Sequence, residues 1–313
     1  MNIALHLGLL VVGFILLIQS AKIFVNGSVG LAQRFGVSTL IIGLTVVAFG
    51  TSAPEIVITT MAAIGGSADI AIANIVGSNL FNLIFIVGFC SIISPLVVDI
   101  RVILKDYLIS LGGIIVLLVM VLAFDQTIPR LASFGLLIIF AAYMGQLTYK
   151  AVQTKTPHEK ETTPPMPLYK SLGLILIGMA VLIASGHLTV SSAVNIAEIL
   201  GISQRIIGLT IIAMGTSLPE LVTGIIACKK GEGEFILGFV IGSSIFNTFL
   251  VLGLAGTITP LAIGPGIATD IIALLLGCII FLIFAKTKGK IARWEGLCMA
   301  LLFLAYMTWA VVF

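Results

Sequence analysis

The sequence predicts an all-α membrane protein with ten transmembrane helices, arranged as two inverted repeats of five helices each. Three observations lead to this fold class: the composition, the number of long apolar stretches, and a motif that occurs twice. Of the 313 residues, 59% are hydrophobic and only 9% are charged. Because soluble domains carry about 25% charged residues, this composition excludes a water-soluble protein.

Ten apolar stretches reach the length of about 20 residues that a helix needs to cross a bilayer. They cover approximately residues 3–25, 40–64, 70–93, 104–124, 130–149, 171–190, 206–228, 235–256, 267–285 and 292–312. The only long polar stretch, 150–170, contains four prolines among charged residues. We therefore interpret it as a cytoplasmic linker between a first repeat, 1–149, and a second repeat, 171–313.

The basic residues predict how the helices are oriented. With the connections numbered along the chain, 14 of the 16 Lys and Arg residues lie in odd-numbered connections, and the even-numbered ones hold only Arg130 and Arg205. Cytoplasmic loops carry an excess of Lys and Arg. We therefore expect cytoplasmic odd-numbered connections and both termini outside, in the cell (plasma) membrane. A net charge of only +3, without basic runs among aromatic residues, gives no indication of nucleic-acid binding.

The duplicated motif is the third observation. The run GVSTLIIGLTVVAFGTSAPEIV begins at Gly36, and the similar run GISQRIIGLTIIAMGTSLPELV begins at Gly201. The same offset continues through IVGSNLFN and VIGSSIFN, so the repeated segments cover 36–96 and 201–261, with 21 identities in the first 53 positions. Because each repeat holds an odd number of apolar stretches, the second enters the membrane from the opposite side. Inverted repeats of this kind are typical of secondary transporters.

Polar residues within the apolar stretches are the candidates for function, since a charge at the centre of a membrane helix costs about 2.5–3.5 kcal/mol on insertion scales. Glu55 and Glu220 are equivalent residues of the two repeats. Hydroxyl and amide side chains accompany them at helical spacing: Thr51, Ser52, Ser78 and Asn82 in the first repeat, and Thr216, Ser217, Ser243 and Asn247 in the second. A set of oxygens without sulfur or imidazole favours hard cations as ligands.

A simpler interpretation stays open for each of these residues. The carboxyls can be protonated or belong to a structural hydrogen-bond network, and a Ser or Thr in a helix usually bonds back to a carbonyl. Pro54 and Pro219 can produce a packing kink, or they can free backbone carbonyls that bind a cation. The four cysteines, Cys90, Cys228, Cys278 and Cys298, lack the spacing of a metal or redox site, and we interpret them as core residues.

The two carboxylates determine which charge the site accepts. One Ca²⁺ neutralises the pair, and so do two Na⁺ ions, so the site can hold either load but not both at once. This competition, combined with alternating access, gives antiport, and protons should compete as well. We expect no cofactor apart from the transported Ca²⁺ and Na⁺, and no obligate protein partner besides the lipid bilayer.

The motifs resemble those of the cation/Ca²⁺ exchanger superfamily, and within it the prokaryotic Na⁺/Ca²⁺ exchangers. GTSAPE and GTSLPE, followed by GSNLFN and GSSIFN, are similar to the two alpha-repeats of that family. The resemblance implies that Glu55 and Glu220 bind Ca²⁺ with the backbone carbonyls of Thr51 and Thr216. It also implies Na⁺ sites formed by these glutamates together with Ser52, Ser78, Ser217, Ser243 and the carbonyls of Ala48 and Ala213.

The resemblance further implies how transport occurs. The first and sixth spans, here 3–25 and 171–190, would slide as a pair past the other eight, and exchange would be electrogenic. Asn247 stands where some relatives, including K⁺-dependent exchangers, have aspartate, so we expect K⁺-independent exchange. The short linker leaves no room for the large regulatory loop of animal exchangers.

Three rival functions are weaker. A Ca²⁺/H⁺ antiporter of the same superfamily typically carries a G-N-[AV]-x-E motif where this chain has GTS-x-PE. A passive cation channel usually places its filter on an oligomer axis, whereas this chain has an inverted pair in one polypeptide. An intramembrane enzyme needs a nucleophile or a metal motif, and no paired aspartates, H-E-x-x-H motif or Ser/His arrangement occurs. We therefore expect a transporter and not an enzyme.

Overall fold

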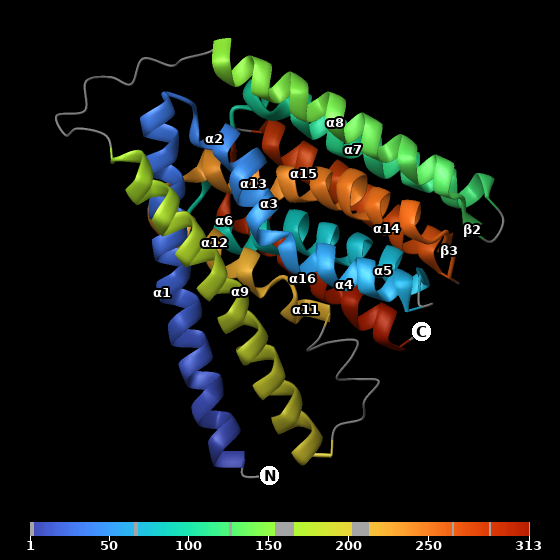
Figure 1. The fold of residues 1–313 in the computed structure, drawn as a ribbon, viewed down its shortest axis with the longest axis horizontal. Helices are drawn as coiled ribbons and strands as arrows, with labels where there is room; N and C mark the ends of the chain where they lie inside the picture. Colours follow the sequence, from blue (N-terminus) through green and yellow to red (C-terminus); the bar gives the residue numbers. More distant parts are fainter. Residues whose placement is uncertain are drawn as a thin grey trace.

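The computed structural model describes residues 3–65, 68–124, 127–153, 166–201, 213–264, 266–287 and 289–312. Within these ranges the protein is helical apart from four strands of two residues each (Figure 1). Two long helices lie together at one side of the molecule, and the other helices form a denser bundle beside them. An all-helical membrane fold is thus confirmed.

The first repeat contains most of its residues in helices, several of which are short segments of one broken span. Its elements are α1 (Ile3–Phe35), α2 (Thr39–Ile42), the π-helical η1 (Gly43–Val47), α3 (Ala48–Thr51), α4 (Ala53–Ile64), α5 (Ala68–Leu80), the π-helical η2 (Phe81–Ile86), α6 (Val87–Ile93), β1 (Leu96–Val97), α7 (Ile100–Ala123), β2 (Thr127–Ile128) and α8 (Arg130–Gln153).

The second repeat follows the same order where it is described. Its elements are α9 (Leu168–Ile199), α11 (Ala213–Gly215), α12 (Leu218–Lys229), α13 (Gly233–Ile245), the π-helical η4 (Phe246–Val251), α14 (Leu252–Ile258), β3 (Leu261–Ala262), α15 (Ile267–Thr287), β4 (Lys290–Ile291) and α16 (Arg293–Val312). The π-helical segments η2 and η4 are related by the same offset along the chain as the sequence motifs.

Among the described residues, seven helical stretches are long and apolar enough to cross a membrane, and an eighth results if the bent pair Thr39–Thr51 and Ala53–Ile64 counts as one span. The expected seventh span, 206–228, lies partly outside the described residues, and the expected tenth forms α16 without being among the seven. The count of ten therefore stays a prediction. The helices α1 and α9 are longer than the predicted 3–25 and 171–190, because polar residues such as Asn26 and Ser191 end an apolar stretch without ending a helix.

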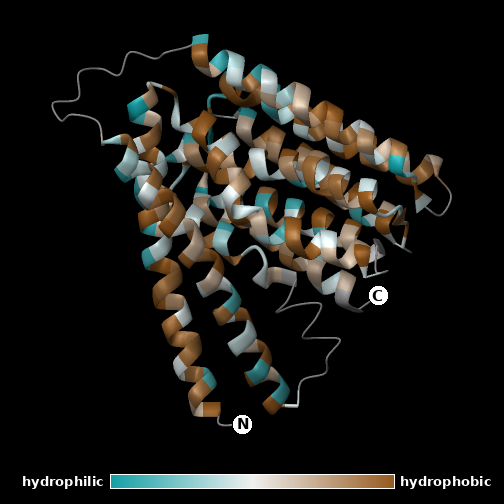
Figure 2. Cartoon of the chain, viewed as in Figure 1, coloured by the Kyte–Doolittle hydropathy of each residue, from teal (hydrophilic) through white to brown (hydrophobic). Residues whose placement is uncertain are grey.

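The helices α1 and α9 run antiparallel and pack closely at glycine positions. A Cβ atom on Gly178 of α9 would lie 2.8 Å from the backbone nitrogen of Phe24 on α1, so only glycine permits this approach. The side of this pair that projects from the bundle is largely hydrophobic along α1 (Figure 2). Exposed Leu7, Val11 and Phe14 are suited to a lipid environment, where apolar surface carries no penalty.

The remaining helices interlock across the two repeats. The helix α16 packs on α6, and the equivalent pair, α8 and α14, also packs together. Two short antiparallel sheets likewise join the repeats: β1 pairs with β4, and β2 pairs with β3. The buried core is therefore shared by both repeats, which are not independent domains.

Candidate functional site

Each repeat contains a helix that is broken next to its glutamate. The helix α3 ends at Thr51 and α4 begins at Ala53, with Ser52 at φ −81° and ψ 5° between them. The axes of the stretches Thr39–Thr51 and Ala53–Ile64 differ by 46°. In the second repeat Ser217, at φ −94° and ψ 10°, precedes α12. Pro54 and Pro219 follow these breaks, and proline has no N–H to donate to the carbonyl four residues earlier. The kink predicted at Pro54 is thus present, and before Pro219 a turn at Thr216 and Ser217 separates α11 from α12.

The breaks place the two glutamates at the centre of the bundle. Glu55 and Glu220 are both 0% exposed. Ser78 donates from Oγ to Oε1 of Glu55 at 3.5 Å, a long hydrogen bond. The two carboxyls are close enough to repel each other, and each lies within electrostatic reach of a hydroxyl of the other repeat: Ser217 for Glu55 and Thr51 for Glu220. The symmetry-related acids therefore converge, as the sequence predicts.

The two asparagines of the motifs lie opposite these glutamates. Asn82 is in η2, which packs against α12, the helix of Glu220. Asn247 is in η4, which packs against α4, the helix of Glu55. Sequence reasoning assumed regular α-helices here, but π-helical turns begin at Phe81 and Phe246 and change the spacing from the preceding serines. Such π-helical segments occur frequently at functional sites.

Many polar atoms around the glutamates are buried and have no hydrogen-bond partner. They are Glu55 Oε2, both carboxyl oxygens of Glu220, the hydroxyls of Ser52, Ser217, Ser243 and Thr223, both amide atoms of Asn82, and Asn247 Oδ1. Outside this cluster, Ser28, Ser133, Ser171 and His6 also have such atoms. A buried polar group without a partner costs about 1–3 kcal/mol, so a concentration of such oxygens around two acids is suited to water or a bound ligand that satisfies them. Cations are such a ligand.

The other predicted ligands differ in whether their oxygen atoms already take part in a hydrogen bond. The Thr51 hydroxyl donates to the Val47 carbonyl at 3.1 Å, so the simple back-bonding interpretation applies to this hydroxyl. The Ala48 carbonyl accepts the Ser52 N–H at 3.0 Å and retains one lone pair. Thr216 is half-buried at the second break, and Ala213 begins α11. Among the described residues no three His, Cys, Asp or Glu side chains form a metal-binding group, so a cation at this position would depend on neutral oxygens as well as the two acids.

Sequence reasoning missed Thr223, whose hydroxyl belongs to the cluster described above, and two further polar residues beside the site, Asn79 and Thr248. Asn247 donates from Nδ2 to Oδ1 of Asn79 at 3.1 Å, and Asn79 donates from Nδ2 to Oγ1 of Thr248 at 3.1 Å. The comparison of the repeats considered polar residues that are identical in both. Asn79 corresponds to Ser244, and Thr248 corresponds to Leu83, so neither pair is identical. The signal available was the polarity of Asn79 within the motif itself.

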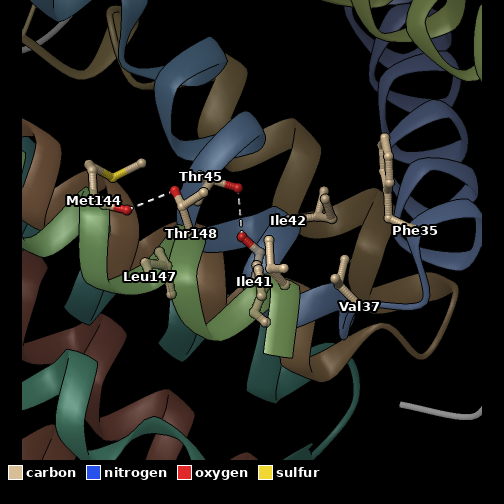
Figure 3. Close-up of a pocket in the computed structure, with 10 residues that line it drawn as sticks. Phe35, Val37, Ile41, Ile42, Thr45, Met144, Leu147 and Thr148 are labelled. Carbon is tan, nitrogen blue, oxygen red and sulfur yellow. Dashed lines mark hydrogen bonds between the residues drawn. The ribbon is translucent and has the colours of Figure 1, made fainter. Parts of the chain in front are cut away.

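A cavity of about 810 Å³ borders the broken segments. Pro54, Thr216 and Pro219 line it, and α9 contributes polar residues that include His187, Asn195 and Glu198. A smaller cavity of about 370 Å³ lies between α2, η1 and α8, away from the glutamates (Figure 3). Its two threonine hydroxyls are already bonded, from Thr45 to the Ile41 carbonyl at 2.7 Å and from Thr148 to the Met144 carbonyl at 2.8 Å. Of these two cavities, the larger one therefore borders the broken segments that carry the glutamates.

Long apolar helices around a buried polar centre, with a cavity at its edge, define a multi-pass membrane transport protein. The sodium/calcium exchanger protein family model matches residues 5–149 and 170–312. The chain belongs to this family, and it is an antiporter of the cation/Ca²⁺ exchanger superfamily. The family resemblance expected from the repeated motifs is confirmed.

Individual relatives match over nearly the whole chain. CaxA of Alkalimonas amylolytica, which is named as a putative antiporter, is 36% identical over 94% of this chain and 95% of its own. The sodium/calcium exchanger MaX1 of Methanosarcina acetivorans is 30% identical over 96% of both chains. A solved structure of the sodium-calcium exchanger NCX_Mj, soaked with Na⁺ and Sr²⁺, superposes with a TM-score of 0.84 at 32% identity, covering 98% of this chain and 99% of that one.

Proposed function

We propose that this protein exchanges Na⁺ for Ca²⁺ across the cell membrane, by alternating access to one site near the middle of the bilayer. The observation that supports this most strongly is the convergence of Glu55 and Glu220, fully buried, among oxygens without partners. Two acids offer a charge that one Ca²⁺ or two Na⁺ ions balance. Ca²⁺ binds six to eight oxygen ligands, so the neutral oxygens nearby complete its coordination.

The proposed ligand set contains the two glutamates and ten residues around them. These are Thr51, Ser52, Ser78, Asn82 and the carbonyl of Ala48 in the first repeat, and Thr216, Ser217, Ser243, Asn247 and the carbonyl of Ala213 in the second. For Thr51 and Thr216 the proposed ligands are the backbone carbonyls. The free hydroxyls of Ser52, Ser217 and Ser243 suit Na⁺, because each can turn an oxygen lone pair to a cation.

Ten spans in two inverted repeats, 1–149 and 171–313 with a linker at 150–170, complete the proposal. The sheet pairing supports it, because β1 and β4 lie in the third and ninth connections, both expected in the cytoplasm. In the same way β2 and β3 lie in the fourth and eighth, both expected outside. Both termini are then external, and the cavity lined by the C-terminal part of α9 is the route to the outer solution.

Alternating access in this proposal comes from the movement of α1 and α9 against the interlocked remainder. The helices α1 and α9 pack tightly on each other. Gly50, beside the break, lies so close to Met179 of α9 and Phe24 of α1 that an added Cβ atom would contact both side chains. A shift of the pair past this contact would close the route along α9 and open one toward the cytoplasm. Exchange is electrogenic if more Na⁺ charge moves than one Ca²⁺ carries. It is independent of K⁺, since Asn247 supplies an amide and no third negative charge.

Uptake of ⁴⁵Ca²⁺ into proteoliposomes tests this function. We expect uptake that follows an imposed Na⁺ gradient, is unchanged by K⁺, and responds to membrane potential. Uptake that follows only a pH gradient would identify a Ca²⁺/H⁺ antiporter. Ca²⁺ leak without any gradient of a coupled ion would identify a channel and refute antiport.

A further inference from the structure

A hydrogen-bonded chain of three side chains crosses between the repeats beside the glutamates. Asn247 donates from Nδ2 to Asn79 Oδ1, and Asn79 donates from Nδ2 to Thr248 Oγ1, each at 3.1 Å. All three side chains are buried. The nitrogen of the Asn247 amide is thereby engaged, while its oxygen has no partner. The nitrogen of this amide thus has an acceptor in Asn79, and its oxygen is available to a ligand.

The equivalent amide of the first repeat is not held in this way. Asn82 has no partner at either amide atom. The positions that correspond to Asn79 and Thr248 are Ser244 and Leu83, and a hydroxyl with a hydrocarbon cannot form the same chain. The two asparagines are therefore equivalent in sequence but different in their surroundings.

Orientation matters for an amide in a cation site, because only its oxygen can bind a cation. If the Asn247 amide turned over, its oxygen would face the oxygen of Asn79. Asn79 would then have to turn over too, and the Thr248 hydroxyl would have to donate instead of accept. A carboxylate at position 247 would need no such control, since both of its terminal atoms are oxygens.

Resting on the proposed cation site, we propose that Asn79 is a positioning residue that holds the Asn247 amide with its oxygen toward the bound cation. In this arrangement Asn79 acts through Asn247, because its oxygen accepts from Asn247 and its nitrogen donates to Thr248. By orienting the Asn247 amide, Asn79 allows a neutral amide to bind the cation at a position where a carboxylate would otherwise be needed. The site thus has one oriented amide, Asn247, and one free amide, Asn82.

The dissociation constant for Ca²⁺, measured by calorimetric titration of the purified protein, tests this role. Asn79→Leu preserves the side-chain volume and removes both hydrogen bonds, and we expect the Kd for Ca²⁺ to rise about tenfold, as for loss of one buried hydrogen bond. In an Asn247→Asp background the same substitution should change the Kd by less than about twofold. Ser244→Ala, at the equivalent position of the other repeat, is the matched control and should leave the Kd unchanged.

An equal rise in both backgrounds would indicate a purely structural effect and overturn the proposal, and so would an unchanged Kd in the Asn79→Leu variant. If that variant does not fold, Thr248→Val removes only the distal acceptor and should raise the Kd about twofold to fivefold, again only with Asn247 present. Because Kd is measured without a gradient, failure of Na⁺-driven uptake would refute the proposed exchange without affecting this comparison.

Discussion

Replacing Glu55 by glutamine removes one of the two negative charges that the proposed site uses. The substitution preserves size and shape, so the chief change is electrostatic: the charge of the pair falls from −2 to −1, and a bound Ca²⁺ keeps an unbalanced positive charge. Glu55 is 0% exposed, so solvent does not screen this loss. Removing the carboxylate from a buried ion pair, here Glu55 with a bound Ca²⁺, costs about 3–5 kcal/mol, which corresponds to about 10²- to 10⁴-fold weaker Ca²⁺ binding.

The fold itself should tolerate Glu55→Gln. Without a cation, two buried acids repel each other and lose hydration, so their neutralisation does not destabilise the unliganded protein. We expect a melting temperature in ion-free buffer at or above that of the unmodified protein, and Na⁺-driven ⁴⁵Ca²⁺ uptake reduced to background. Glu220→Gln should behave in the same way, since the two residues are equivalent.

A matched control is available in Glu295, a buried carboxylate far along the chain. It accepts the Ala292 N–H at 2.7 Å and the Thr287 hydroxyl at 3.1 Å, which caps the start of α16. Glu295→Gln keeps one acceptor oxygen and loses one of these two hydrogen bonds, so it should lower stability by about 0.5–1.5 kcal/mol and leave the KM for Ca²⁺ unchanged. If Glu55→Gln instead transported Ca²⁺ with the KM of the unmodified protein, Glu55 would not be a ligand and the proposed site would be wrong.

Three further predictions concern the moving parts and the ions. Gly178→Leu should separate α1 from α9, because even a Cβ atom there would meet the Phe24 backbone at 2.8 Å, and transport should fall at least tenfold while Ca²⁺ binding in detergent changes little. Lys230 donates to the Asn26 side chain and so connects the end of α12 to α1. Lys230→Gln should therefore increase hydrogen–deuterium exchange in residues 26–35. Unchanged exchange would show that this hydrogen bond does not hold α1 in place. Ca²⁺ at 100 times its Kd should stabilise the protein by about 2.7 kcal/mol, seen as a higher melting temperature that a chelator reverses and that the Glu55→Gln variant lacks.

The features that identical polar residues mark in both repeats were predictable from the sequence, and those that depend on helix geometry or on contacts between helices were not. The constant offset between the two motifs pointed to Glu55 and Glu220 as partners, and to kinks at Pro54 and Pro219. Apolar length gave the membrane class, because it is a local property of the sequence. The lengths of α1 and α9 were underestimated, since an apolar window ends at the first polar residues while the helical hydrogen bonds continue.

The chain through Asn79 could not have been predicted for a different reason. Its hydrogen bonds join residues 168 and 169 positions apart in the sequence, and they follow from how two helices cross. The π-helical turns at Phe81 and Phe246 were not predicted either. An i→i+5 hydrogen bond leaves no pattern of residue types that differs from the pattern of an α-helix.

The two small sheets bear on biosynthesis. Every described strand of the N-terminal portion pairs with one from the C-terminal portion: β1 with β4, and β2 with β3. While the chain is being made, the loops that contain β1 and β2 must wait, with unpaired backbone groups, until their partners in the C-terminal portion have been synthesised and inserted. If synthesis stops at the linker, the product therefore lacks both sheets, because the partner strands β3 and β4 are missing. We expect quality-control proteases to degrade this product unless the C-terminal portion is supplied as a separate chain.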